Sequence, residues 1–282
     1  TAEFDSSGEL LPGRYLAGSR DEAIFQPSWA PDGTLYFVSD ANEWWNLYRM
    51  TGHGIEAVTS LEADMGLPQW VFGQRTYGFP AANRISAAAS AHGQWQLYGL
   101  ELPGGAPQPL ATDLSSIEHV SAGGGATAVL GGCPVRPSRI ILFDAGGARE
   151  LARAGADLMT PADVSRPRPL TFPVGEGEAA HALFYPPCST SHQPRAGERP
   201  PLLVKCHGGP TGAASAALDL KIQFWTSRGF AVLDVNYRGS TGYGRRYRRA
   251  LYGRWGQADV EDCAAGARYV CEQGLADPDR LL

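Results

Sequence analysis

The sequence predicts a β-rich N-terminal part and a mixed α/β C-terminal part within one chain of 282 residues. The first observation is a strand and turn pattern that returns about every 40 to 50 residues in the N-terminal half. The second is a strand, helix, strand pattern after Pro201, in which short apolar runs flank a segment with helical spacing. The chain is long enough for two domains, and its 35 glycines and 21 prolines suit many tight turns.

The repeat begins at residues 27–40, where two strand-like runs flank Asp32-Gly33, a pair typical of hairpin turns. Residues 46–48 follow, and we interpret them as the inner strand of a blade. Three later segments repeat the pattern: residues 68–70, 96–98 and, more weakly, 139–144. The spacing predicts a partial β-propeller of about three four-stranded blades.

Residues 152–177 mix prolines with charges, and they predict a linker or hinge rather than packed core. We place the boundary near Pro169, so that residues 1–168 form the partial propeller and residues 169–282 form the second domain. A strand over residues 179–185 begins that domain. The polar residues 188–200 predict a solvent-exposed loop.

Residues 201–210 combine a short apolar strand with a sharp turn. The apolar run at 202–204 suits a buried strand of a parallel sheet. In His207-Gly208-Gly209-Pro210, two successive glycines leave backbone amides uncovered by side chains, as the binding of an oxyanion requires. A simple glycine and proline turn without catalytic role remains the alternative at this point.

Two helices and a second strand follow this turn. The first helix is predicted over residues 215–228, with Leu218, Ile222 and Trp225 on one face and Gly229 at its end. A strand at 230–235 completes a crossover unit, and a glycine-rich loop follows it. The second helix is predicted over residues 257–273, with four positions facing inward: Val260, Ala264, Ala267 and either Val270 or Cys271.

Four motifs in a fixed order resemble the prolyl oligopeptidase family of serine peptidases, in particular its acylaminoacyl-peptidase and dipeptidyl-peptidase-like branch. They are residues 207–210, residues 234–244, Trp255-Gly256 with residues 259–262, and residues 277–280. The resemblance implies a propeller that caps the first part of an α/β-hydrolase domain, and hydrolysis of short peptides through an acyl-enzyme. It also implies that the catalytic Ser, Asp and His lie downstream of Leu282. We therefore expect a fragment without a catalytic residue, inactive alone.

The same resemblance implies the oxyanion donors in this chain. The amide of Gly209 is the first candidate, the amide of Gly208 the second, and the imidazole of His207 a third. For His207 we favour local hydrogen bonds that shape the turn. Ser240 is the closest substitute for a nucleophile, but Arg238 stands where the strained turn of a nucleophile elbow needs a small residue. We therefore predict a structural role for that loop.

Other polar residues favour structural roles as well. Asp259 and Asp262 lie near a helix start and suit the helix dipole better than acid–base chemistry. Glu43 would be placed to contact a substrate amine, but we favour a buried aromatic pair, Trp44 and Trp45, with a solvated Glu43 beside it. The arginines at 245, 246, 248 and 249 predict surface or inter-domain contacts.

Composition excludes several classes of function. The net charge of -5 and the absence of a basic run argue against nucleic-acid binding. No apolar run approaches the ~20 residues that span a bilayer. The six histidines lack metal-ligand spacing, and we expect neither metal nor cofactor. Five cysteines without a Cys-x-x-Cys pair indicate a reducing, cytoplasmic compartment.

Two other functions remain open from the residues. The first is an esterase or lipase, because the His-Gly-Gly turn suits any hydrolase of this fold. The second is a non-catalytic propeller that binds partners and carries a hydrolase remnant. A Gly-x-Ser-x-Gly elbow shortly after Leu282 would favour an enzyme. An incomplete ring of blades exposes sheet edges, so we also expect the isolated chain to be poorly soluble or to form homo-oligomers.

Overall fold

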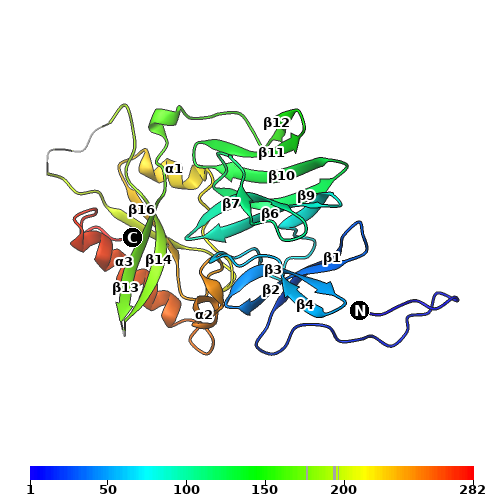
Figure 1. Ribbon diagram of the computed structural model, residues 1–282. Helices are drawn as coiled ribbons and strands as arrows, with labels where there is room; N and C mark the ends of the chain where they lie inside the picture. The colour runs from blue at the N-terminus through cyan, green and yellow to red at the C-terminus, as the bar shows by residue number, and fades with distance from the viewer. Residues whose placement is uncertain (176, 193–194, 196) are drawn as a thin grey trace.

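The computed structural model describes residues 1–175, 177–192, 195 and 197–282, and these residues form four four-stranded sheets (Figure 1). The first three sheets are antiparallel and follow the chain order. The first contains β1 (Ile24–Trp29), β2 (Leu35–Asn42), β3 (Trp44–Thr51) and β4 (Gly54–Ala57). The second contains β5 (Tyr77–Ala81), β6 (Arg84–Ala91), β7 (Gln94–Glu101) and β8 (Gln108–Pro109). The third contains β9 (Ser116–Gly123), β10 (Ala126–Cys133), β11 (Arg136–Asp144) and β12 (Gly147–Arg153).

These sheets are the predicted blades. The interior strand β2 is apolar on both faces, because one face packs on the second blade and the other on the N-terminal segment. In β2, Leu35 and Phe37 face one cluster, whereas Tyr36 and Val38 face another. This alternation follows from the two-residue period of a strand. The cluster around Tyr36 also holds Ile85 of β6, so it joins the first two blades.

The predicted repeat is confirmed for three of its segments, since residues 46–48, 96–98 and 139–144 lie in β3, β7 and β11. Each is the third strand of its blade and lies inside the sheet. The interpretation of residues 46–48 as an inner strand agrees with the sheet order, because β3 lies between β2 and β4. Residues 68–70 were misassigned, since they lie in a turn between β4 and β5.

The fourth sheet is mixed and has the order β13 (Arg168–Gly175), β14 (Glu178–Tyr185), β16 (Ala231–Asn236), β15 (Leu202–Cys206). β15 and β16 are parallel, and the other pairs are antiparallel. α3 (Ala258–Glu272) packs on one face through Val270, next to Leu233 and Phe172. α1 (Leu220–Thr226) packs through Ile222 on the other face, next to Val232. A 3-10 turn, η1 (Pro161–Asp163), precedes this sheet.

The predicted linker is partly wrong, because β13 runs through it. Pro169 and Pro173 belong to this strand, yet β13 is an edge strand, where a residue without an N–H is tolerated. Phe172 between them is 1% exposed and belongs to the core. Glu176 of this segment lies outside the described residues, as do Gln193, Pro194 and Ala196 of the predicted loop. The domain boundary near Pro169 stays a prediction.

The predicted helices need two corrections. α1 begins at Leu220 rather than at residue 215, because the side chain of Asp219 accepts a hydrogen bond from the amide of Lys221 at 2.8 Å and caps the helix. In α3, Ala267 and Val270 are buried as predicted, whereas Val260 is 61% exposed and Ala264 is also exposed. Asp262 faces inward instead, and its ion pair with Arg238 sets the orientation of the helix.

The predicted inter-domain role of the arginine cluster is confirmed by α2 (Gly244–Arg249), which lies against the first blade (Figure 1). The side chains of three arginines form ion pairs with that blade or with the segment before it: Arg245 with Glu43, Arg248 with Asp40 and Arg249 with Asp21. The backbone amide of Arg246 donates to the carboxylate of Glu43. The cluster therefore joins the two parts of the chain.

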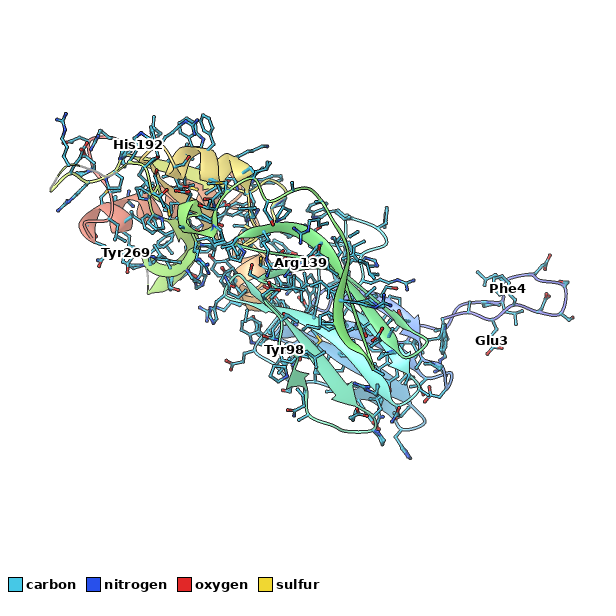
Figure 2. The ribbon with its side chains drawn as sticks, turned by 90° about the horizontal axis from the view of Figure 1, so that it is seen from above. Glu3, Phe4, Tyr98, Arg139, His192 and Tyr269 are labelled. Atoms are coloured by element: carbon cyan, nitrogen blue, oxygen red, sulfur yellow. The ribbon has the colours of Figure 1, made fainter. Side chains whose placement is uncertain are left out.

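The N-terminal segment lies apart from the sheets, and Figure 2 shows Glu3 and Phe4 extending away from the blades. Phe4 is 71% exposed. Across the described ranges, the helices are too short and too polar to cross a membrane.

Candidate active site

The segment that follows β15 forms a turn with exposed backbone amides. We call residues 207–212 the oxyanion loop, after the role that the sequence predicts for them. Gly209 has a φ of +64°, in the left-handed region that favours glycine, and the amide of Gly212 donates to its carbonyl at 2.9 Å. A Cβ atom on Gly208 would meet nothing within 4 Å. Among the described residues, no acceptor bonds the amides of Gly208 and Gly209, so both remain available to a ligand.

His207 begins this loop, and its imidazole is held by local partners. The ring stacks on Tyr237 at 4.5 Å between centroids, and the Tyr237 hydroxyl donates to the His207 carbonyl at 3.2 Å. Nε2 lies 2.7 Å from Oγ of Ser240, and Nδ1 lies 3.3 Å from the carbonyl of Gly208. Burial lowers the pKa of His207. In either tautomer both ring nitrogens face local groups, which favours the amides over the imidazole as donors.

Ser240 is not placed as a nucleophile. It is 0% exposed, and its hydroxyl donates to the carbonyl of Tyr237 at 2.8 Å. The preceding Arg238 is 4% exposed and is bound by Glu178 and by Asp262. This geometry supports a structural role for the glycine-rich loop. The hydrogen bond between Ser240 and His207 is then a structural contact rather than part of a catalytic pair.

Asp262 anchors that loop to α3. The carboxylate is 0% exposed, and it accepts hydrogen bonds from the amide of Arg238 at 2.7 Å and from Nη2 at 2.8 Å. These bonds raise the pKa of Arg238. Asp259 accepts a hydrogen bond from the amide of Gly256 at 2.8 Å. Both aspartates thus have structural partners, in line with the interpretation from sequence.

Glu43 also has partners within the chain. It accepts a hydrogen bond from the amide of Arg246 and lies 3.7 Å from Nε of Arg245. Trp45 is 3% exposed and stacks on Phe25, whereas Trp44 is only half-buried. The predicted pair of buried tryptophans is therefore limited to Trp45. The geometry favours a contact between the two parts of the chain over a contact with a substrate amine.

Sequence reasoning missed one residue of the site, Trp70. Its Nε1 donates to Oγ1 of Thr211 at 3.0 Å, across 141 residues of sequence. No local sequence pattern predicts such a long-range contact, and the repeat predicts a strand rather than a turn at residues 68–70. In the part of the chain that the structure describes, no group of three or more His, Cys, Asp or Glu side chains could hold a metal ion.

Comparisons with known proteins agree with this arrangement. A model described as the prolyl oligopeptidase family matches residues 216–282. The acylamino-acid-releasing enzyme of Arabidopsis thaliana is 36% identical over 93 residues, which is 33% of this chain and 12% of that protein. Dipeptidyl aminopeptidase BIII of Pseudoxanthomonas mexicana is 35% identical over 81 residues, which is 29% of this chain and 12% of that protein.

Solved structures extend the similarity to the blades. A crystal structure of puromycin hydrolase has a TM-score of 0.93 and 37% identity, over 99% of this chain and 43% of that chain. A puromycin-hydrolyzing peptidase of Mycobacterium tuberculosis has a TM-score of 0.92 and 34% identity, over 97% of this chain and 43% of that chain. An acylaminoacyl peptidase of Pyrococcus horikoshii, at 19% identity and a TM-score of 0.65 over 91% of this chain and 40% of that chain, shares the fold.

Fold and comparisons together define a class of protein, a partial β-propeller joined to the N-terminal portion of an α/β-hydrolase domain. Residues 216–282 match the prolyl oligopeptidase family, and nearly the whole chain is similar in fold and sequence to solved puromycin hydrolases. The chain spans less than half the length of the solved relatives and matches about an eighth of the curated ones.

Proposed function

We propose that this chain is part of a serine peptidase that hydrolyses short peptides through an acyl-enzyme. The observation that supports this most directly is the pair of unbonded amides at Gly208 and Gly209, which follow a parallel strand in a chain that resembles this family. Backbone amides fixed in this way stabilise the charge that develops on a carbonyl oxygen under attack. A propeller beside the site would restrict the substrates that reach it to short peptides.

In the proposed mechanism, a serine hydroxyl downstream of Leu282 attacks the peptide carbonyl while a histidine takes its proton. The carbonyl π electrons move to oxygen, and the amide of Gly209 donates to that oxyanion together with the amide after the serine. Collapse breaks the C–N bond, and the histidine protonates the leaving amine. Water then cleaves the ester and restores the serine. The buried position of Ser240 supports a nucleophile outside residues 1–282.

A fluorophosphonate probe tests this proposal. The longer protein that contains this chain should be labelled at a single serine and should hydrolyse short peptide amides. The chain of residues 1–282 alone should remain unlabelled. Labelling at Ser240, or at another serine before Leu282, would contradict the proposed site.

The same experiment separates the two alternative functions. An esterase or lipase would be labelled but would cleave only esters. A non-catalytic binding module would not be labelled.

All five cysteines, each among the described residues, are free. As part of the proposal, this supports a reducing, cytoplasmic location.

A further inference from the structure

The connection between the first two blades reaches the oxyanion loop through Trp70. Its indole Nε1 donates to Oγ1 of Thr211 at 3.0 Å. A Cβ atom placed on Gly209 would lie 2.8 Å from Cζ2 of Trp70 and 3.1 Å from Cη2. The indole ring therefore packs directly on the backbone of Gly209, the residue whose amide is the first candidate donor.

Other residues support the two ends of the oxyanion loop. At its start, Ser240 and Tyr237 hold His207. At its end, the amide of Thr241 donates to the carbonyl of Gly212 at 3.0 Å, and Oγ1 of Thr241 donates to the carbonyl of Thr211 at 2.6 Å. These contacts all come from the α/β part of the chain.

The middle of the loop depends on a different support. Gly208 and Gly209 have no side chains, and glycine moves between backbone conformations more easily than any other residue. The φ of +64° at Gly209 sets the direction of the neighbouring amides. The indole ring of Trp70 lies against the backbone of Gly209. Its hydrogen bond to Thr211, two residues further along the loop, fixes the position of the ring.

We propose that Trp70 is a positioning residue for the oxyanion hole. It holds the amide of Gly209 in the direction that an oxyanion requires, so the propeller contributes to the chemical step as well as to access. This inference rests on the proposed function. Trp70 is 58% exposed, so its removal uncovers little buried apolar surface and should leave the fold intact.

The test uses the longer protein that contains this chain, with Trp70→Ala, Trp70→Phe and a matched control, Phe72→Ala. Phe72 lies on the same connection and is 93% exposed. We expect Trp70→Ala to lower kcat by about tenfold or more, because small displacements of catalytic groups are costly. KM should change less than about twofold, for substrates with small and with large side chains alike. Trp70→Phe keeps part of the ring and should lose less, and Phe72→Ala should match the wild type.

A double-mutant cycle with Gly209→Ala supplies a second measurement. The added methyl group would contact the indole ring, so Trp70→Ala should relieve part of the damage, and the two losses in kcat should multiply to more than the double variant shows. Circular dichroism and thermal unfolding check that each variant folds. If Trp70→Ala fails to fold, Trp70→Phe replaces it in the cycle.

The outcomes separate this inference from the function on which it rests. A wild-type protein that neither reacts with the probe nor cleaves peptides contradicts the proposed function. A wild-type protein that is active, with Trp70 variants equal to it, contradicts the positioning role alone. A rise in KM confined to large side chains, with kcat unchanged, would also contradict it, because Trp70 would then contact the substrate directly.

Discussion

The sequence predicts a structural role for Asp262, but it does not predict the ion pair with Arg238 that gives Asp262 this role. The helical spacing of α3 suggested Val260 and Ala264 as inward positions, because they are apolar. The structure turns the helix so that the carboxylate of Asp262 meets Arg238 instead. A buried charge must be paired, and this requirement overrides a weak apolar pattern. The partner stands 24 residues earlier in the chain, beyond the reach of any local periodicity.

His181 gives a prediction about pH at the same scale. The ring stacks on Tyr243 at 4.2 Å, Nδ1 lies 3.0 Å from Oγ1 of Thr171, and His92 is 6.1 Å away. Burial, with a smaller effect of His92, lowers the pKa of His181 from 6.5 to about 4. Between these values the unfolded chain binds a proton that the folded chain does not. The free energy of unfolding should therefore fall as the pH drops from 6.5 towards 4.

The variant His181→Phe isolates this effect, because it keeps an aromatic ring against Tyr243 and removes the titration. Urea unfolding at several pH values between 7 and 4.5 should show a smaller loss of stability for the variant than for the wild type. Parallel pH curves for the two proteins would mean that His181 does not contribute.

At the scale of elements, the sequence predicted the strands better than their positions in the sheets. The turn at Asp32-Gly33, the strand at 179–185 and the helix at 257–273 have local signals, and the structure contains each of them. β13 was missed because its prolines indicate a linker, and only the sheet order shows that it is an edge strand. The oxyanion loop was predicted for the same reason as the hairpin, a local glycine pattern. Its contact with Trp70 was not, since that contact is long-range.

Phe172 tests whether β13 is core rather than linker. It is 1% exposed and lies between the sheet and α3, where Gly266 lets the helix approach its ring. Phe172→Ala should lower the free energy of unfolding by about 3 kcal/mol through loss of buried area and the cavity that remains. Phe172→Leu is the control and should lose about half as much. A loss below about 0.5 kcal/mol in urea unfolding of Phe172→Ala would support a linker after all.

At the scale of the whole molecule, polar groups rather than apolar ones link the α/β part to the first blade and to the connection after it, which contains Asp64. Asp64 is 0% exposed, and its Oδ2 accepts hydrogen bonds from the amides of Gly242 at 2.8 Å and Gly244 at 3.2 Å. Burial raises the pKa of Asp64. Beside it, Arg248 pairs with Asp40 and lies 4.0 Å above the ring of Trp45. The arginine-rich sequence predicted contacts between the two parts, whereas the acidic partners carry no recognisable motif.

The pair of Arg248 and Asp40 should determine whether the two parts unfold together. Both side chains are at least 92% buried, so Arg248→Ala leaves a buried carboxylate unpaired and should cost about 3 kcal/mol of the free energy of unfolding. Adding Asp40→Ala should restore part of this loss, because the unpaired charge is then gone. The matched control is Arg249→Ala on the same helix, whose partner Asp21 is 84% exposed. That change should cost less than about 1 kcal/mol.

Differential scanning calorimetry should show one transition for the wild type and two for Arg248→Ala, since the blades lose their fixed contact with α2. Equal losses for Arg248→Ala and Arg249→Ala, with a single transition in both, would mean that the other polar contacts between the parts, such as those of Asp64 with Gly242 and Gly244, suffice to hold them together.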